Sequence, residues 1–245
     1  MNILLLGGIA ESKALAKRLI ERGDRVIYSI VGLVRTPSLD CEVRTGGFSR
    51  EGVDGVDGMA EFCSQRNIEL IVDASHPYAE DISAHAMAAA SVAGIECWRY
   101  LRPGWNADNY AGWYSVSSMD ELWPLLSTFR RPFFTIGASA LDYTDQRLPQ
   151  QHWIVRTAQS MPQVEGVTQV NRIGPFYYDD EISLMAEYAV DAVVSKDSGC
   201  QRVAAKLDAA RDRKLPVFII TRPELVDAHC EFSTPDLLVD ALCDR

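Results

Sequence analysis

The residues best suited to chemistry stand directly after short apolar runs, and the first of these positions is a glycine turn. Gly7 and Gly8 join an apolar run at residues 3–6 to a helical pattern that continues past Ser12. Backbone N–H groups and the positive end of a helix favour a diphosphate at such a turn, and glycine lets the anion approach closely. Ser12 occupies the third glycine position of the common dinucleotide pattern. The turn alone therefore fits either a nucleotide site or an ordinary strand-to-helix connection.

The end of the second predicted strand, residues 25–31, indicates which nucleotide would bind. Sites selective for NAD usually place an acidic side chain there for the ribose 2′-hydroxyl. This strand has no such acid, whereas Ser29, Arg35 and Thr36 offer hydroxyl and guanidinium groups that suit a 2′-phosphate. The sequence therefore favours NADPH over NADH. A nearby glycine pair, Gly46 and Gly47, is followed by Phe48 and could border the same nucleotide or be an ordinary turn.

A histidine turn follows the apolar run at residues 69–74, so it lies at the carboxyl edge of the predicted sheet. It contains Ser75, His76 and Pro77. Proline biases the residue before it away from helix, which leaves the His76 imidazole available to a ligand. His76 could then donate a proton or orient a nicotinamide amide. A structural hydrogen-bonding role for the histidine stays open.

A polar turn in the second half has the same arrangement. Lys196, Asp197, Ser198 and Gly199 stand between a predicted strand and a predicted helix. Hydroxyl groups and a lysine at such a turn suit an anion, and a carboxylate is served as well as a phosphate. The alternative is a capping turn with a solvated lysine.

Other chemistries lack their residues. Residues 137–140 lack the second glycine of a hydrolase elbow, and the sequence has no H-E-x-x-H. The six cysteines include no C-x-x-C pair, so we predict no metal site and no redox dithiol. With 24 basic and 34 acidic residues the net charge is −10, which disfavours nucleic acid or an anionic membrane as a partner.

The framework that must position these turns alternates between strands and helices. The 245 residues suggest between one and two domains. Strand, glycine turn, helix and strand over residues 3–31 form a βαβ unit, which requires a parallel sheet. The first half continues with a helix at 58–65, a strand at 69–74, a helix at 80–93 and a strand at 95–100.

The composition changes at Arg102 to Trp105, where we place the boundary between an N-terminal domain, residues 1–102, and a C-terminal domain, residues 103–245. Two α/β lobes with parallel sheets are expected to flank a central, ligand-binding cleft. The second half is predicted to contain helices at 120–128, 180–188 and 201–212, strands at 133–137, 152–157, 192–195 and 216–221, and a last helix that starts near residue 234.

Targeting signals are missing from the pattern. The N-terminal apolar run is too short for the core of a signal peptide. No stretch approaches the roughly 18 apolar residues of a membrane span. We therefore expect a cytoplasmic protein.

Together these motifs resemble those of the precorrin-6A reductase family of cobalamin biosynthesis. The similarity spans almost the whole chain, in motifs at residues 5–8 with Glu11, 32–36, 46–48, 72–79, 102–105 and 196–199. The resemblance implies two Rossmann-like lobes and an NAD(P)H-dependent oxidoreductase that acts on CH–CH groups. It also implies hydride delivery to a carbon–carbon double bond of a carboxylate-rich tetrapyrrole.

On this resemblance we expect NADPH-dependent reduction of precorrin-6A to precorrin-6B. His76 and Lys196 are the candidate proton donors. The expected cofactor contacts are Gly7, Gly8, Ile9, Ala10, Glu11, Ser29, Arg35, Thr36, Gly46, Gly47, Phe48, Ser75, His76 and Pro77. The expected substrate contacts are Arg99, Arg102, Arg172, Lys196, Asp197, Ser198, Gly199 and Arg222.

A non-catalytic NADP(H) sensor that acts through a partner protein is the alternative function. The polar turn at residues 196–199 and the arginines would be superfluous in such a sensor. A short-chain dehydrogenase is disfavoured because no Tyr-x-x-x-Lys pair is present. We expect a monomer or a weak homo-oligomer, and the sequence leaves open whether the tetrapyrrole carries cobalt.

Overall fold

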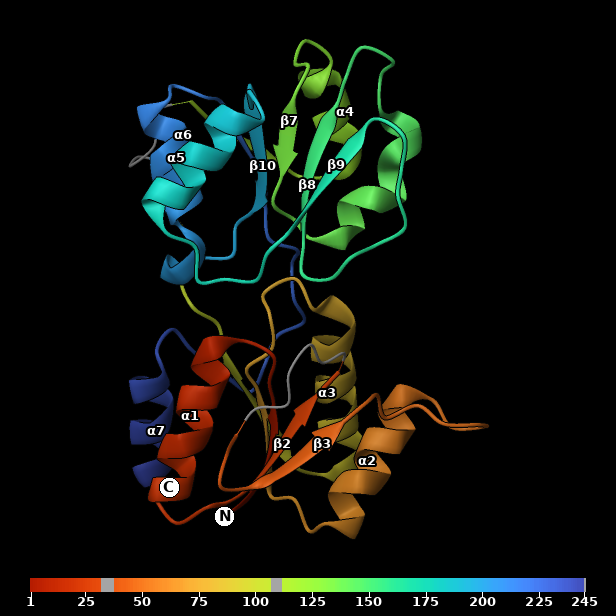
Figure 1. Cartoon of the computed structure of the whole chain (residues 1–245). Helices are drawn as coiled ribbons and strands as arrows, with labels where there is room; N and C mark the ends of the chain where they lie inside the picture. Colours follow the sequence, from red (N-terminus) through yellow and green to blue (C-terminus); the bar gives the residue numbers. More distant parts are fainter. Residues whose placement is uncertain (32–37, 107–111, 245) are drawn as a thin grey trace. The chain divides into compact units, whose positions relative to one another are not determined.

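The structure is a computed structural model that describes residues 1–31, 38–106 and 112–244 (Figure 1). It divides into two compact units, Met1–Pro103 with Pro223–Arg245, and Gly104–Arg222. Within the described residues, each unit contains a six-stranded sheet in which every neighbouring pair is parallel. The predicted α/β class with two parallel sheets is confirmed. The cleft expected between the lobes stays a prediction.

The first unit has the strand order β12-β5-β4-β1-β2-β3. Helices α1 and α7 cover one face of this sheet, and α2 and α3 cover the other (Figure 1). The strands are β1 (Asn2–Leu6), β2 (Arg25–Ile30), β3 (Glu42–Thr45), β4 (Leu70–Asp73), β5 (Glu96–Tyr100) and β12 (Cys230–Phe232). The helices are α1 (Ala10–Glu21), α2 (Gly55–Gln65), α3 (Glu80–Ala93) and α7 (Pro235–Cys243).

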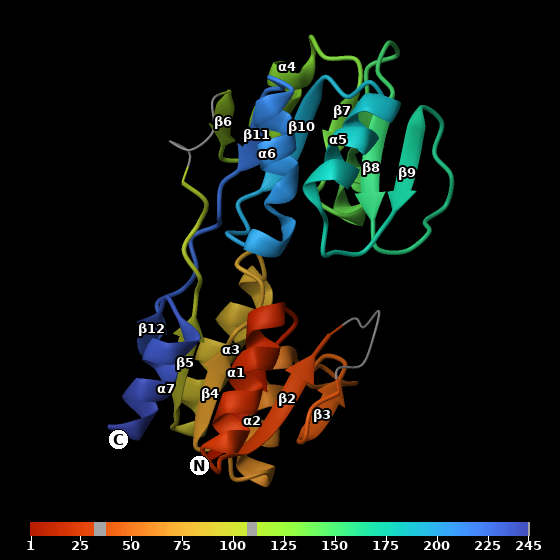
Figure 2. The same cartoon turned by 60° about the vertical axis from the view of Figure 1, so that its left-hand side comes forward.

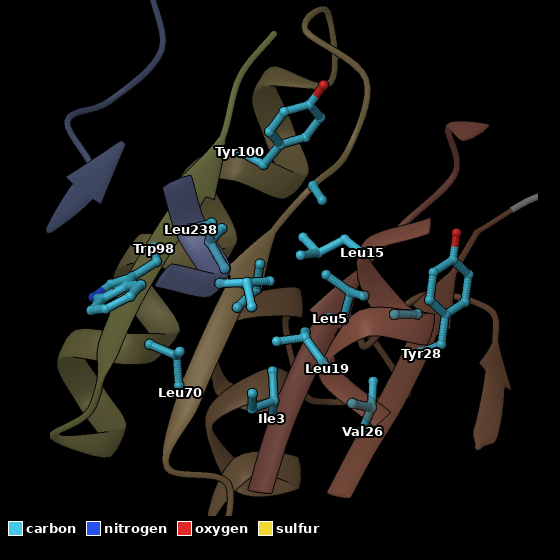
Figure 3. Close-up of a cluster of buried hydrophobic side chains, with 14 of the residues drawn as sticks. Ile3, Leu5, Leu15, Leu19, Val26, Tyr28, Leu70, Trp98, Tyr100 and Leu238 are labelled. Carbon is cyan, nitrogen blue, oxygen red and sulfur yellow. The ribbon is translucent and has the colours of Figure 1, made fainter. Parts of the chain in front are cut away.

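Strand β1 is apolar from Ile3 to Leu6 because both of its faces are buried there. Ile3 and Leu5 point into the core beneath α1 and α7, where they meet Leu15 and Leu238 (Figure 3). Leu4 and Leu6 point to the other face and pack into a second core against α2 and α3. A strand in the middle of a covered parallel sheet has this continuous apolar pattern.

The C-terminal segment belongs to the first unit, which differs from the predicted division at residue 103. Strand β12 pairs with β5, and Leu238 and Leu242 of α7 are buried in the core beside α1. The Arg22 guanidinium also donates to the Leu242 carbonyl at 2.6 Å. The N-terminal boundary lies within one residue of the predicted position, whereas residues 223–245 were assigned to the wrong domain.

The second unit has the strand order β6-β11-β10-β7-β8-β9 (Figure 2). Helices α5 and α6 pack on one face, and on the other Trp123 of α4 stacks on Trp153 at 5.7 Å. The strands are β6 (Trp113–Val116), β7 (Pro132–Phe134), β8 (Trp153–Thr157), β9 (Val167–Asn171), β10 (Ala192–Lys196) and β11 (Val217–Ile220). The helices are α4 (Met119–Leu126), α5 (Tyr178–Glu187) and α6 (Ala205–Asp212), with 3-10 segments η2 (Ala138–Gln146) and η3 (Gln201–Val203).

No helix in the described part of the chain combines the length and apolarity needed to cross a membrane. The same residues include no group of three or more His, Cys, Asp or Glu side chains placed to hold a metal ion.

Candidate functional site

A pocket of about 230 Å³ lies at the carboxyl ends of β1, β2 and β4 in the first unit. Strand β1 stands between β4 and β2, so the strand order reverses at this point. Doubly wound sheets bind nucleotides at such a reversal. The pocket brings together three turns that are distant in sequence, and its lining is Leu6, Gly7, Gly8, Ser29, Ile30, Val31, Phe48, Ser75, His76, Ala79 and Ile82.

Both glycines of the first turn are required by the local structure. A Cβ on Gly7 would lie 2.2 Å from Cζ of Tyr28, so only glycine fits beside that buried ring. Gly8 has φ of +136°, a conformation that side chains other than glycine rarely adopt. A Cβ there would meet no atom of the described residues within 4 Å. The backbone at Gly8 is therefore open to a ligand.

Ser12 replaces the third glycine by a hydrogen-bonded network. Its Oγ accepts from the Gly8 N–H at 3.2 Å and donates to the Ile9 carbonyl at 2.8 Å. It also lies 2.7 Å from the Tyr28 hydroxyl. Burial raises the pKa of Tyr28, which keeps the phenol neutral. The serine in the glycine position was the sequence signal for this network, but Tyr28 could be found only from the fold.

Three backbone donors at the start of α1 remain available to a ligand. Ile9 provides no side-chain cap for the helix. Within the described residues, the N–H groups of Ile9, Ala10 and Glu11 have no acceptor. The Glu11 carboxylate is paired with Arg102 at 2.9 Å, which offsets its negative charge. These donors and the helix dipole suit a diphosphate, so the turn fits the expected dinucleotide.

The histidine turn is held by a buried carboxylate at the end of β4. Asp73 accepts from the N–H and the hydroxyl of Ser75 at 3.1 and 2.7 Å, and from the Ser83 hydroxyl on α3 at 2.6 Å. It also meets Nε of Arg99 at 3.3 Å. Asp73 thereby fixes both ends of the turn that carries His76. Asp73 belongs to the sequence motif at residues 72–79, but this role could not be predicted from the motif.

His76 lines the pocket, and its protonation is directed by a neighbour. Nδ1 accepts from the Tyr78 N–H at 3.3 Å across the intervening Pro77. This contact places the proton of a neutral imidazole on Nε2. His76 can therefore act as a donor at Nε2.

The residues expected at the adenosine end are only partly covered by the structure. Ser29 lines the pocket and is 3% exposed. Arg35 and Thr36 lie outside the described residues. Phe48 lines the pocket as well, whereas the carbonyls of Gly46 and Gly47 accept hydrogen bonds from Arg44.

Two arginines that were predicted to contact the substrate are buried in the first unit. Arg99 is 2% exposed and is engaged by Asp73 and by the carbonyl of Val226 at 2.8 Å. Arg102 is 7% exposed and pairs with Glu11. These positions favour structural roles for both guanidinium groups over the predicted contact with substrate.

The polar turn of the second unit follows β10 at the carboxyl edge of its sheet. Burial lowers the pKa of the Lys196 ammonium group. Asp197 accepts from the Trp105 N–H at 2.8 Å, and Nε of Arg222 donates to the Asp197 carbonyl at 2.9 Å. Asp197 thus organises the turn and joins the first and last segments of this unit.

The other predicted members of this edge differ in exposure. Ser198 is 7% exposed and lies beside Gly199, which has φ of +65°. Arg172 follows β9 and has an exposed side chain. The hydrogen bond from Arg222 to Asp197 places Arg222 beside the turn formed by residues 196–199. Arg172 stands at the end of a different strand.

The second unit also buries charged groups that the sequence analysis did not single out. Nη2 of Arg156 donates to both Glu181 oxygens, at 2.7 and 2.9 Å. Nζ of Lys206 lies 5.2 Å from the centre of the Trp105 ring. Burial and the nearby Arg156 lower the pKa of Lys206 to about 7.

Comparisons with known proteins agree over nearly the full length. The family model for precorrin-6x reductase CbiJ/CobK matches residues 2–242. A precorrin-6A reductase from Rhodococcus erythropolis is 38% identical, and the match covers 93% of this chain and 91% of that protein. A cobalt-precorrin-6A reductase from Priestia megaterium is 28% identical, with coverage of 99% and 98%. The solved structure of a CobK precorrin-6A reductase has a TM-score of 0.87 and 28% identity, covering 100% of this chain and 97% of that one.

Proposed function

The chain belongs to the precorrin-6x reductase family and is therefore an oxidoreductase, and we propose that it reduces precorrin-6A to precorrin-6B with NADPH in cobalamin biosynthesis. The observation that carries this proposal is the joint presence of the family match and the pocket lined by Gly7, Gly8 and His76. The protein would act as a monomer or a weak homo-oligomer.

The first unit binds the cofactor in this proposal. Gly8 and the free N–H groups at the start of α1 hold the diphosphate. Ser29, together with Arg35 and Thr36, binds the adenosine ribose. Ser75, His76 and Pro77 border the nicotinamide. When bound, the cofactor supplies the hydride, and the protein supplies orientation and electrostatics.

The second unit binds the substrate carboxylates through the turn after β10 and through Arg172 and Arg222. Ser198 and Gly199 shape the turn, and Asp197 holds it in place. Reduction of a carbon–carbon double bond adds a hydride to one carbon and a proton to the other. The lowered pKa of Lys196 makes its proton easier to release, and His76 offers a second donor at Nε2.

The sensor alternative is not favoured. A non-catalytic NADP(H)-binding regulator would need no polar turn for an anionic substrate. The relatives that match over nine-tenths of the chain carry the names of reductases.

The direct test mixes purified protein, NADPH and precorrin-6A, and follows the loss of nicotinamide absorbance. Mass spectrometry should show that the product has gained two hydrogens. Parallel reactions with NADH and with the cobalt-containing substrate determine the preferred cofactor and substrate form. Oxidation of NADPH at the same rate with and without substrate would refute the proposal.

A further inference from the structure

Arg44 lies beside the cofactor pocket on β3, directly before the glycine pair that could border the nucleotide. Strand β3 pairs with β2 so that Arg44 stands opposite Ser29. Nη1 of Arg44 lies 3.5 Å from Oγ of Ser29, which lines the pocket. The guanidinium also stacks 3.8 Å from the centre of the Phe48 ring, another lining residue. Arg44 is therefore in contact with two side chains of the pocket wall.

The orientation of Arg44 is fixed by the backbone around it. Nη1 donates to the Gly46 carbonyl and Nη2 to the Gly47 carbonyl, both at 2.6 Å. A guanidinium has five N–H donors, so the contacts with these carbonyls and with Ser29 leave donors for a ligand. The group is preorganised, which reduces the entropy lost when an anion binds.

No carboxylate neutralises this guanidinium in the described part of the chain. Glu42 on the same strand pairs with Arg66, and Glu61 on α2 pairs with Arg50. Arg44 is half-buried, and burial lowers the pKa of its guanidinium. A partly desolvated cation without a counter-ion gains more from an anionic ligand than a solvated one does.

We propose that Arg44 binds the 2′-phosphate of NADP(H) and sets the preference for this cofactor over NAD(H). The position fits, because the end of the second strand and its outer neighbour is where doubly wound sheets recognise the adenosine ribose. The inference rests on the proposed function for the identity of the cofactor. It adds a residue on β3 to the predicted Ser29.

The test measures nucleotide binding without any reaction. Isothermal titration compares adenosine 2′,5′-bisphosphate with 5′-AMP on the whole protein, because the two differ only in the 2′-phosphate. Arg44→Ala should weaken the bisphosphate by roughly 10- to 100-fold, as expected for loss of a charge-assisted hydrogen bond, and leave 5′-AMP unchanged. Arg44→Lys should restore part of the loss.

Arg66→Ala is the matched control. Its guanidinium also lies over an aromatic ring, 5.7 Å from the centre of Phe62, but unlike Arg44 it pairs with a surface acid, Glu42. It should leave both affinities unchanged. Thermal unfolding confirms that each variant is folded, and Arg44→Gln replaces the alanine variant if that one is not.

Several results would overturn the inference. Equal weakening of both nucleotides by Arg44→Ala would assign the residue to adenine stacking. Unchanged affinities for both nucleotides in Arg44→Ala would remove Arg44 from the site. Precorrin-6A assays separate the two proposals: reduction without Arg44-dependent selectivity refutes only this inference, and selectivity without reduction refutes only the proposed function.

Discussion

Asp73 accepts hydrogen bonds from both the backbone N–H and the hydroxyl of Ser75, at 3.1 and 2.7 Å. The carboxylate belongs to β4 and the serine to the turn that follows, so the pair fixes the direction in which the chain leaves the sheet. His76 comes next in sequence and reaches the pocket because of this direction. The positioning of the candidate proton donor thus depends on a residue that does not line the pocket.

Replacing Asp73 with alanine should lower the free energy of unfolding by about 3–5 kcal/mol. The change leaves the guanidinium of Arg99, 2% exposed, without its carboxylate partner. Urea unfolding followed by circular dichroism measures the loss. Ser75→Ala removes one neutral partner from the same carboxylate and should cost only about 1 kcal/mol. Equal losses in the two variants would contradict this account.

Gly7→Ala should destabilise the first unit by about 1–3 kcal/mol, because the new methyl group would overlap the buried ring of Tyr28. Gly47→Ala is the control. The nearest atom to its new methyl would be the Ser49 nitrogen at 4.0 Å, so we expect a change within about 0.5 kcal/mol. Thermal unfolding of both variants and of Gly7→Ala combined with Tyr28→Val tests the cause. A double variant no more stable than Gly7→Ala would locate the strain elsewhere.

His76→Asn should lower kcat by roughly a hundredfold or more if Nε2 donates the proton, a typical factor for general acid catalysis. NADPH affinity, measured by titration, should change little, because the variant keeps a polar side chain at the pocket wall. His229→Asn is the control, since His229 contacts the Cys97 backbone and does not line the pocket. A kcat unaffected by His76→Asn would transfer the role to Lys196 or to solvent.

Lys206 should make stability rise with pH. Its pKa is about 7 in the folded protein and near 10.5 when unfolded, so between these values the unfolded chain binds one proton more. Stability therefore increases across this range by at most about 1.4 kcal/mol per pH unit. This added stability is lost as the pH falls towards 7. The groups that interact electrostatically with the buried amine are Arg156, Glu181 and Cys200.

Lys206→Met should remove this slope and stabilise the protein near neutral pH, because an apolar side chain has no charge to desolvate. Urea unfolding at a series of pH values measures the pH dependence of the free energy of unfolding. Lys13→Met on the exposed face of α1 is the control. A slope that persists in Lys206→Met would assign the pH dependence to another group.

The central elements of both sheets could be predicted from the sequence, and the edge strands could not. β1, β4 and β10 are buried on both faces, so each contains a continuous apolar run, at residues 3–6, 70–72 and 192–194. Three of the four edge strands, β6, β9 and β12, were missed. β6 and β12 have exposed positions and owe their extended form to pairing with β11 and β5, which a local pattern cannot reveal.

The candidate site was predictable only where a turn follows a strand directly. Gly7, Gly8 and His76 were found in this way, and the structure places them in one pocket. The substrate role of Arg99 stays a prediction, because the sequence gives its position at a strand end but not that its side chain meets Asp73. Arg44 precedes the glycine pair predicted to border the nucleotide, but its contact with Ser29 could not be predicted, because that contact arises from the register of two strands.

The return of residues 223–245 to the first sheet affects how the chain folds while it is being synthesised on the ribosome. Residues 104–222 are inserted into the sequence of the first unit, so all of them leave the ribosome before β12 and α7 do. The inserted unit can complete its core during translation. The first unit cannot complete its core until β12 and α7 are made, and until then one face of its sheet is partly uncovered. A nascent chain stalled after residue 222 would therefore expose apolar surface to chaperones.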